Sequence, residues 1–482
     1  MKTAFKVIIS FALAAAILFS LSSCVTINTP KKAEESTADA PESESAGTEY
    51  DYKKVENNFI EVMKSYLFRL GDADFGGASF LIAAPNTSLI DGEGKGLAMS
   101  EEILLRNRDV EDKLNVKISS KLVDVDTLYD TLRSTCMTND FFADAVMIPQ
   151  YCVHQFAAAG ILFNFNTLPF ADFESDFNIK SGVEAAMANS TGWALGGWST
   201  LDEDSLPAVF FNKALVRETG LGDPYELVRN GKWTWDAFFA YTAALPSLDE
   251  GLLYSYGCES ISSSLADAVY FSEGNRFITS GLGTYPAVAM DGTALAHTVN
   301  TERALFGDDK KVMNPSEAIE IFADGGSMFL IDRLGTMKTI CTSKAVWGVL
   351  PMPKQSEEQA GYCSLVGPEA LMLAVPANST GAEKVSRVTA AMNICSLGSL
   401  VDAYLQDCMY YYLRDNDSID SVEAICYGAV WDMAYSAGGY DDSIPNATYY
   451  AIRNVSEGNG EIQEYIDNYA YGASVALSGL FP

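Results

Sequence analysis

The sequence predicts an α/β protein in which mainly parallel sheets are covered by helices on both faces. Between residues 80 and 160, short apolar runs alternate with longer segments of helical periodicity, and strands that alternate with helices usually form parallel sheets. The 482 residues provide enough chain for two large lobes. The composition agrees, because 48% of the residues are hydrophobic and 11% are aromatic, which is typical of a globular protein with a buried core.

Residues 1–23 are predicted to be an export signal. Lys2 and Lys6 precede an apolar run, residues 7–21, which two serines interrupt. This run is shorter than the ~20 residues that a membrane-spanning helix needs, so we expect a signal peptide rather than a transmembrane anchor. The segment ends in Leu21-Ser22-Ser23-Cys24, which resembles the bacterial lipobox, where the cysteine is lipidated and becomes the first residue. The alternative is an ordinary secretory signal with an incidental cysteine.

A tether and one helix are predicted to follow the signal. Residues 24–56 are rich in small, polar and acidic residues, and residues 25–49 include no aromatic side chain. A segment of this composition cannot bury a core and stays disordered. In residues 57–75, apolar side chains recur at helical spacing, and Gly71 is placed to end the helix. The members of this apolar stripe are Phe59, Met63, Tyr66, Leu67 and Leu70.

The alternation that predicts the first sheet consists of three strands and three helices. Each predicted strand is a short apolar run, and the third ends at Pro149. The predicted strands are residues 80–83, 116–118 and 145–148. The predicted helices are residues 101–114, 127–137 and 150–160.

Two later helix starts carry the same capping residues. In Asp223-Pro224-Tyr225-Glu226, a carboxylate precedes a proline at the first helical position and a glutamate at the third. Asn314-Pro315-Ser316-Glu317 repeats this arrangement, and its helix is predicted to stop at Gly325-Gly326. Both motifs are structural signals that frame the segments between them.

A third helix start lies in Trp233-Thr234-Trp235-Asp236. The Thr234 side chain can cap the helix, while Asp236 lies near its positive N-terminus. We expect Trp233 and Trp235 to pack in the core rather than touch a ligand, and Met328 to fill core space at a strand end.

The charge of the chain excludes one class of partner. Acidic residues outnumber basic ones by 64 to 32, and the formal charge falls from −32 to −34 when Lys2 and Lys6 leave with the signal. Phosphate binding needs clustered lysine and arginine, so no nucleic-acid partner is expected. Such an acidic surface suits a soluble body held off an anionic membrane surface.

Eight cysteines remain beyond Cys24, and none of them forms a CxxC pair. An export signal permits disulfides, but eight cysteines in a long chain do not make a disulfide framework. Because scattered cysteines usually pack as small hydrophobes, we expect mostly free thiols, with room for one or two bridges. The eight are Cys136, Cys152, Cys258, Cys341, Cys363, Cys395, Cys408 and Cys426.

Several motifs occur in the order in which one known family carries them. An apolar strand ending in Phe-Asn-Lys, residues 209–213, leads to a helix start containing Trp-Thr-Trp-Asp, residues 231–238. Residues 322–328 are similar to the family's Phe-x-x-Gly-x-x-Ala-Met, and residues 347–354 to its Gly-x-x-Pro-x-Pro. Together with Arg106-Asn107-Arg108, Val110-Glu111, and Arg414-Asp415 before Ser418, this ordered set over residues 80–435 resembles the bacterial family 1 extracellular solute-binding proteins.

The resemblance implies a periplasmic-binding-protein type II fold, in which crossing hinge strands join two α/β lobes. It assigns residues 76–206 and 362–413 to lobe 1, and residues 207–361 and 414–482 to lobe 2. Two features depart from the family pattern: Ser327 stands where the family has alanine, and residues 260–300 match nothing in it. Such an insertion can change the pocket, so the ligand class is less constrained than the fold.

The same resemblance implies a function. The chain is expected to be the extracytoplasmic substrate-binding subunit of an ABC importer, a monomer attached to the outer face of the membrane only through its lipid anchor. It would capture a carbohydrate, in particular an oligosaccharide, in the cleft between the lobes and deliver it to the permease subunits. A peptide or a polyamine is the alternative ligand of the same class.

The sequence gives little support to an enzyme. Only His154 and His297 are present, and no HExxH, GxSxG, phosphate-loop or CxxC motif occurs, so neither a His-centred metal site nor a Ser-His triad is indicated. We expect no cofactor and no metal. Two carboxylates about 5–10 Å apart can hydrolyse glycosides, so a surface glycan-processing enzyme is the alternative of another class.

Ligand-binding residues are expected at the carboxyl ends of the predicted strands, where open α/β sheets bind their ligands. A sugar site combines aromatic ring faces with Asp, Asn, Arg and Ser side chains, and the loops at these positions carry that combination. The candidate ligand-binding residues are Asn86, Ser88, Tyr151, Trp198, Asp332, Arg333, Trp431, Asp432 and Tyr435.

Structural alternatives apply to several of these candidates. Trp198 lies between glycines and a serine and is the best candidate for stacking on a sugar, but it can equally pack at the hinge. Asp332 and Arg333 can instead pair with each other as a solvated ion pair, and Trp431 can be a core residue.

Overall fold

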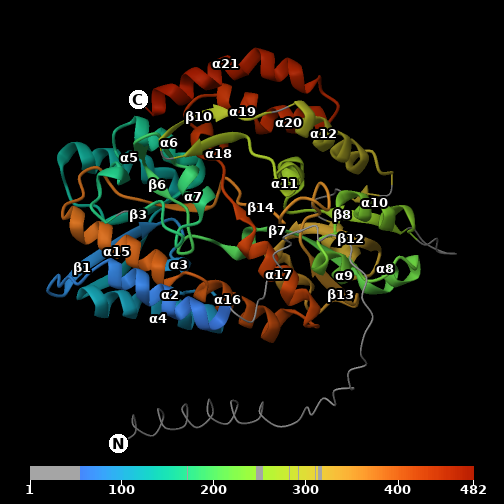
Figure 1. The fold of residues 1–482 in the computed structure, drawn as a ribbon, viewed down its shortest axis with the longest axis horizontal. Coiled ribbons are helices and arrows are strands. Elements are labelled where there is room, and N and C mark those ends of the chain that lie inside the picture. Colours follow the sequence, from blue (N-terminus) through green and yellow to red (C-terminus); the bar gives the residue numbers. More distant parts are fainter. Residues whose placement is uncertain are drawn as a thin grey trace, which may run out of the picture. The chain divides into compact units, whose positions relative to one another are not determined.

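The computed structural model describes residues 55–170, 172–245, 253–281, 283–290, 292–309, 311–312 and 317–481. These residues belong to one compact unit, residues 53–482. The predicted signal, Cys24, the tether and the cap at Asn314 lie outside the described residues. Within them, the chain forms two five-stranded sheets flanked by helices (Figure 1).

The first sheet has the strand order β2-β1-β3-β15-β6. β1 (Ala78–Ala84) pairs in parallel with β2 (Val116–Leu122) and β3 (Ala145–Pro149). β15 (Leu371–Ala374) pairs antiparallel with β3 and with β6 (Ala194–Leu195). The three strands predicted here are confirmed, with somewhat longer bounds.

Helices flank the first sheet where the periodicity predicts them. α4 (Leu97–Leu114) and α5 (Val125–Thr138) correspond to two predicted helices. The third predicted helix divides into the 3₁₀ turn η2 (Gln150–Cys152) and α6 (Val153–Ala158). Asp124 caps α5 by accepting a hydrogen bond from the backbone N–H of Asp126, as a carboxylate at this position should.

The N-terminal helix α2 (Val55–Arg69) packs on α15 (Ala382–Cys395) of the first sheet. The chain turns at Gly71, whose φ of 75° lies in the left-handed region that favours glycine. The Tyr66 ring of α2 meets the Phe177 ring edge-on, with 5.1 Å between the centroids. The predicted role of this helix in core packing is therefore confirmed.

The second sheet has the strand order β11-β8-β12-β7-β13. Its parallel strands are β11 (Lys311–Val312), β8 (Tyr254–Cys258) and β12 (Ser327–Arg333). β7 (Pro207–Asn212) is antiparallel to both β12 and β13 (Trp347–Leu350).

Both sheets are mixed rather than mainly parallel, and the chain path explains the difference. The chain leaves the first sheet after β6 and enters the second at β7, then leaves after β13 and returns at β15. A strand that arrives from the other sheet does not need the crossover helix that parallel strands require. The strands next to these crossings are accordingly the antiparallel ones.

The capping motifs of the second sheet are confirmed where they are described. α9 (Pro224–Arg229) begins after Asp223, whose Oδ1 accepts a hydrogen bond from the backbone N of Tyr225 at 3.0 Å. α10 (Trp235–Ala243) begins after Thr234, whose hydroxyl accepts a bond from the backbone N of Ala237 at 3.3 Å.

Trp233 and Trp235 are core residues, as predicted. Their exposed fractions are 0% and 1%. The Trp233 indole N–H donates to the Pro351 carbonyl at 2.9 Å, and the Trp235 indole N–H donates to the Ser272 hydroxyl at 3.2 Å. Met328, the second residue of β12, is also fully buried, which confirms its predicted packing role.

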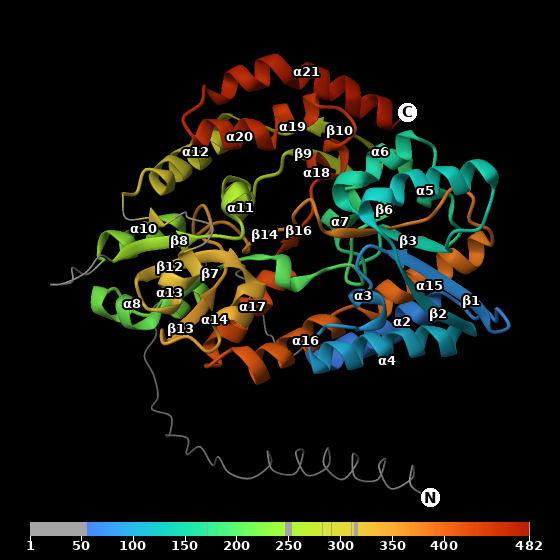
Figure 2. The same ribbon diagram turned by 180° about the vertical axis from the view of Figure 1, so that it is seen from behind.

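The C-terminal segment forms a group of helices that contacts parts of both sheets. α21 (Ile462–Leu480) lies along α19 (Ser443–Ala447) and near α20 (Tyr449–Ser456), as both views show (Figures 1 and 2). α18 (Met433–Gly438) packs on η2 and α6 beside the first sheet, and α20 packs on α11 (Leu265–Ser272) of the second.

The remaining elements are short or connect the sheets. They are α3 (Ser88–Asp91), η3 (Phe165–Thr167), α7 (Lys180–Glu184), β4 (Met187–Ala188), β5 (Thr191–Gly192), η4 (Glu203–Ser205), α8 (Lys213–Thr219), η5 (Ser262–Ser264), β9 (Ile278–Gly281), β10 (Thr284–Val288), α12 (Gly292–Phe306), α13 (Ala318–Ala323), η6 (Leu334–Thr336), α14 (Met337–Ile340), β14 (Ser364–Leu365), α16 (Ser399–Asp407), the π-helical turn η7 (Cys408–Tyr412), α17 (Asp417–Tyr427) and β16 (Ala429–Val430).

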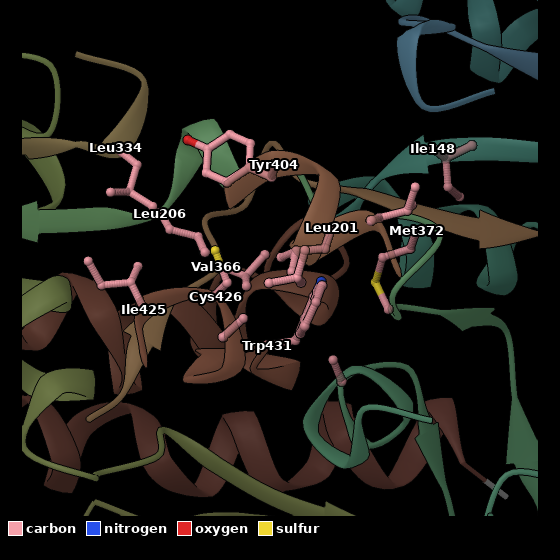
Figure 3. Close-up of a cluster of buried hydrophobic side chains, with 14 of the residues drawn as sticks. Ile148, Leu201, Leu206, Leu334, Val366, Met372, Tyr404, Ile425, Cys426 and Trp431 are labelled. Carbon is pink, nitrogen blue, oxygen red and sulfur yellow. The ribbon is translucent and has the colours of Figure 1, made fainter. Parts of the chain in front are cut away.

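One apolar core runs from the second sheet to the first through the crossing segments. Figure 3 shows Leu334, Leu206, Leu201, Val366 and Met372 within this buried cluster, which extends to both sheets. The eight cysteines of the described residues are unpaired, and five of them are buried, so the expectation of mostly free thiols is confirmed.

Within the described part of the chain, no single helix combines the length and apolarity needed to cross a membrane, although the bent pair formed by residues 382–395 and 399–412 meets both criteria when the two helices are taken together. The same residues hold no group of three or more His, Cys, Asp or Glu side chains arranged to bind a metal ion.

Candidate ligand-binding site

Several accessible polar groups lie at one edge of the first sheet. β1 and β3 end at this edge, and the antiparallel β15 begins there, because Leu371 pairs with Pro149. Asn86 is exposed and Ser88 half-buried after β1, and the Asn86 Oδ1 accepts a hydrogen bond from the Ser88 backbone N at 2.9 Å. This is the edge at which open α/β sheets bind ligands.

Tyr151 lies at the same edge, next to the turn that precedes β15. Its backbone N–H donates to the Pro368 carbonyl at 3.2 Å, and the Gln150 N–H donates to the Ala370 carbonyl at 2.8 Å. Burial, with the nearby Cys152 and Glu369, raises the pKa of Tyr151 to about 12. The phenol therefore stays protonated at neutral pH and can donate a hydrogen bond. Glu369 is exposed beside it.

The buried Arg106 and the half-buried Asn107 hold the loop that carries Asn86 and Ser88. The guanidinium of Arg106, only 1% exposed, donates from Nη2 to the Leu89 carbonyl at 2.9 Å. The Asn107 amide donates to the Ile90 carbonyl at 2.7 Å, and its Oδ1 accepts from Arg106 Nη2 at 2.9 Å. Burial lowers the pKa of Arg106 to about 10, so the group is still charged at neutral pH. These residues position the loop rather than contact a solute.

The second sheet presents the corresponding edge, where β8, β12 and β13 end. Asp332 is fully buried there and does not face solvent. Its Oδ2 accepts from the backbone N–H groups of Glu259 and Ser260 at 3.2 and 2.9 Å. Its Oδ1 accepts from the Arg333 backbone N–H at 2.7 Å and from the Thr336 hydroxyl at 3.0 Å.

Asp332 thus holds the backbone of this edge and does not face solvent. A buried carboxylate needs donors to offset its lost hydration, and four donors satisfy this one. The Arg333 and Ser260 side chains are the exposed groups at this edge. The solvated ion pair considered for Asp332 and Arg333 is not formed, because the Asp332 carboxylate is buried and bound to the Arg333 backbone.

Trp198 is packed at the hinge rather than presented at an edge. It is half-buried, and its ring meets the Tyr427 ring of α17 edge-on at 5.6 Å. It also packs against the small cluster that contains Phe177 and Ile394 and includes side chains of α2. This placement corresponds to the hinge-packing alternative.

Trp431 and Asp432 are also core residues in this structure. Trp431 is 1% exposed, and its indole lies so close to Gly196 that a Cβ there would come within 2.9 Å of Nε1. Asp432 caps α18 by accepting from the Ala434 N–H at 2.9 Å, and also accepts from the Phe277 N–H at 3.0 Å. Burial raises the pKa of Asp432 to about 7.

Tyr435 is buried in the C-terminal group of helices. Its hydroxyl donates to Asp267 Oδ2 at 2.7 Å, and Asp267 in turn pairs with Arg453, whose Nε lies 3.0 Å from Oδ1. The Tyr435 ring stacks on Tyr449 at 5.1 Å. Sequence reasoning placed Trp431, Asp432 and Tyr435 in a loop, whereas the structure uses all three as packing and capping groups.

The segment that crosses from β6 to β7 carries three consecutive acids. Asp202 pairs with Lys95 at 2.8 Å, and Asp204 accepts from the Tyr404 hydroxyl at 3.0 Å. Glu203 lies between them, is 1% exposed, and has no hydrogen-bond partner for either carboxyl oxygen among the described residues. Burial raises the pKa of Glu203 to about 8, so it is largely protonated at neutral pH.

A cavity of about 560 Å³ lies between the first sheet's loops and the hairpin of β9 and β10. Its lining is mainly polar, with one aromatic ring. The lining residues are Phe173, Glu174, Ser175, Asp176, Asn178, Lys180, Val183, Glu184, Ser280, Gly281 and Thr284.

The sequence matches no protein-family model and no curated protein. The structure is similar to the sugar-binding protein MalE from Xanthomonas citri, with a TM-score of 0.55 and 12% identity over 83% of this chain and 98% of that one. It is also similar to the cyclic α-maltosyl-1,6-maltose binding protein from Arthrobacter globiformis, with a TM-score of 0.54 and 14% identity over 84% and 100%. This chain has the periplasmic-binding-protein type II fold.

A third solved structure with the type II fold is UgpB from Mycobacterium tuberculosis, determined in complex with glycerophosphocholine. Its TM-score is 0.50, with 17% identity over 84% of this chain and all of that one. The fold expected from the motifs is therefore confirmed. The first sheet forms the centre of one lobe and the second sheet the centre of the other; the exact division of residues between the lobes stays a prediction.

Two exposed residues at these edges, Glu369 and Ser260, are not among the sequence candidates. Glu369 precedes β15, an antiparallel strand, and so reaches the edge from its amino end, whereas the candidates came from the carboxyl ends of strands. Ser260 lies just after β8, inside the segment that matches no family motif. The Gly367-Pro368 turn directly before a buried strand was the sequence feature that could have indicated an exposed position at Glu369.

Proposed function

We propose that this protein is the extracytoplasmic substrate-binding subunit of an ABC importer and that it binds a carbohydrate between its two lobes. The observation that carries the proposal is the type II fold combined with accessible hydrogen-bonding side chains at both sheet edges. The proposed contacts are Asn86, Ser88, Tyr151 and Glu369 on the first lobe, and Ser260 and Arg333 on the second.

These side chains suit a sugar. The Tyr151 ring offers an apolar face, while amide, hydroxyl, carboxylate and guanidinium groups can hydrogen-bond the hydroxyl rim of a saccharide. A ligand that contacts both lobes stabilises the closed arrangement, because it binds that arrangement better than the open one. The closed form then presents the surface that the permease subunits recognise.

Delivery follows from the proposed location. Cys24 would carry the lipid anchor, and the acidic tether would let a monomeric body move near the membrane surface. The chain acts as a binder without a cofactor and not as an enzyme in this proposal. Incubation with maltotetraose tests that point, since release of shorter sugars would indicate a glycan-processing enzyme instead.

The test of the proposed site is Tyr151→Ala. A thermal-shift screen of maltooligosaccharides and other sugars first identifies a carbohydrate probe, since a ligand at about 100 times its dissociation constant adds ~2.7 kcal/mol to the free energy of unfolding. Titration calorimetry with that probe should then show about ten- to hundredfold weaker binding by Tyr151→Ala, because a buried aromatic contact contributes roughly 1–3 kcal/mol.

The control variant is Tyr254→Ala. Tyr254 is also half-buried but begins β8, at the opposite edge of the second sheet. It should keep normal affinity. If Tyr151→Ala binds as tightly as the unmodified protein, the sugar does not contact this edge, and the hinge aromatic Trp198 becomes the next residue to test.

A phosphodiester solute is a second candidate ligand. The observation that favours it is the exposed Arg333 at the second lobe's edge, because a guanidinium suits a phosphate group. UgpB, which has the same fold, was solved with glycerophosphocholine. Including glycerophosphocholine in the thermal-shift screen separates the two: a shift with it that Arg333→Gln removes, and none with sugars, would replace the carbohydrate proposal.

A further inference from the structure

The segment of residues 260–300, which matches no family motif, is rooted in the second lobe at both ends. α11 buries Leu265 and Val269 in the apolar cluster that contains the second sheet's Tyr256 and the Trp235 of α10. α12, which follows the segment's hairpin, adds Leu305 to the same cluster. Between these helices, the hairpin of β9 and β10 leaves that core.

The hairpin docks on one turn of the first lobe through backbone hydrogen bonds. Asn189 joins β4 to β5 and has a φ of 52°, in the left-handed region. Its N–H lies 2.8 Å from the Thr284 carbonyl and 3.1 Å from the Gly281 carbonyl. The Asn189 carbonyl accepts from the Gly283 N–H at 2.8 Å.

A second bond from the hairpin reaches the helix beside that turn. The Ser280 hydroxyl donates to the Glu184 carbonyl at 2.7 Å. These hydrogen bonds border the cavity of about 560 Å³ described above. The hairpin also places Ile278, with the half-buried Val288, in an apolar cluster that includes Ala188 of β4 and the half-buried Trp193. A contact with few buried apolar side chains separates more easily than a packed core.

The C-terminal helices also contact the hairpin segment and the first lobe. The Phe277 N–H, just before β9, donates a hydrogen bond to Asp432. The Ser436 hydroxyl of α18 donates to the Ala185 carbonyl of the first lobe. At the end of the chain, the Phe481 ring meets His154 of α6 edge-on at 5.2 Å.

We propose that the hairpin of β9 and β10 is a clasp that holds the two lobes together and must leave Asn189 before they can separate. The helices on either side of the hairpin anchor it in the second lobe by apolar packing, and the hairpin meets the first lobe through a few hydrogen bonds and the limited apolar contact around Ala188. The weaker contact is therefore the one that opens. This inference concerns the movement of the lobes and holds for any ligand.

The test uses the full-length protein without ligand and three variants. Asn189→Val should strain the left-handed turn, because β-branched residues rarely adopt positive φ. Asn189→Gly should leave it intact, because glycine adopts this conformation without strain. Asn139→Val is the matched control, since Asn139 also has a positive φ of 58° but caps α5, outside the hairpin contact.

Hydrogen exchange and small-angle X-ray scattering give the two readouts. We expect Asn189→Val to speed exchange of the Gly283 and Asn189 amides about tenfold or more and to raise the radius of gyration. Asn189→Gly and Asn139→Val should match the unmodified protein in both. If Asn189→Val does not fold, Ser280→Ala should give a smaller change in the same direction in both readouts.

Two results would overturn the clasp. One is faster exchange in the hairpin with an unchanged radius of gyration, which would make it a surface loop without influence on the lobes. The other is unchanged exchange in Asn189→Val, or in Ser280→Ala where that variant is used. Both readouts are taken without ligand. They therefore do not depend on whether the protein binds a sugar in the test of the proposed function.

Discussion

Two buried charged residues of this protein hold loops in place. Arg106 and Asp332 lie in the cores of different lobes, and each bonds the backbone of the loop that forms that lobe's edge. Removing ions from water is costly unless such partners are supplied. Glu203 differs from these two, because both of its carboxyl oxygens lack a hydrogen-bond partner among the described residues.

The unpartnered Glu203 predicts a pH dependence of stability. Its pKa is raised to about 8 in the folded chain, from an ordinary value of about 4.3. At a pH between these two pKa values, Glu203 is ionised in the unfolded chain but still protonated in the folded chain. The free energy of unfolding therefore falls by ~1.4 kcal/mol for each unit by which the pH rises. The contribution is complete below about pH 4 and is lost as the pH rises to about 8.

The variant Glu203→Gln measures this effect. Glutamine cannot ionise. The free energy of unfolding of the variant, relative to that of the unmodified protein, should therefore increase by roughly 3–5 kcal/mol as the pH rises from 5 to 8. Urea midpoints at both pH values give the difference. Glu101→Gln, at an exposed position of α4, is the control and should show no such gain. A difference that does not grow with pH would show that Glu203 is ionised in the folded chain, paired with Lys95 nearby.

Among the elements, α10 shows most directly how local sequence and core packing combine. Thr234 caps the helix, and the flanking Trp233 and Trp235 fill the second lobe's core. The Trp233 ring lies 6.1 Å from the Phe329 ring of β12, and the Trp235 ring 5.4 Å from that of Phe238. The helix is thus joined to the sheet by aromatic contacts.

Trp235→Ala should therefore destabilise the protein by roughly 3–5 kcal/mol, as expected for a large-to-small change in a packed core. Denaturant unfolding measures the loss, and titration with the sugar probe should show nearly unchanged affinity in the folded fraction. Trp235→Phe, which keeps most of the volume, should cost much less. A variant of normal stability that no longer binds would place this helix in the ligand site instead.

At the scale of the whole molecule, the two lobes share one continuous core through the crossing segments (Figure 3). The C-terminal helices and the hairpin add contacts on another side. The proposed movement of the lobes would therefore bend the crossing segments while leaving their apolar packing intact. A protein built in this way can switch between two arrangements without unfolding either lobe.

The proposed membrane attachment is also a property of the whole chain. Cys24→Ser should abolish lipidation, because the thiol is the acceptor, and should release the protein from membranes or leave it misprocessed. Fractionation of cells and incorporation of labelled fatty acid measure the change. Ser23→Ala keeps a small residue before the cysteine and should remain lipidated. A Cys24→Ser protein that still carries fatty acid would refute the lipoprotein assignment.

The sequence by itself determined several elements and the α/β class of this protein. Strands such as β1 and β3, and caps such as Asp223 and Thr234, follow from local apolar periodicity and from side chains that bond the nearest backbone groups. The ordered motifs from residue 209 to residue 354 pointed to the correct type II fold.

Only the tertiary structure decided which candidate residues lie at the sheet edges and which lie inside. Asn86 and Arg333 are accessible, whereas Asp332 and Trp431 are buried, although all four lie at or just beyond the end of a strand. The difference arises because burial depends on neighbours far along the chain, such as Gly196 against Trp431 and Ser260 against Asp332. Local patterns contain no information about such partners, because only the folded chain brings them together.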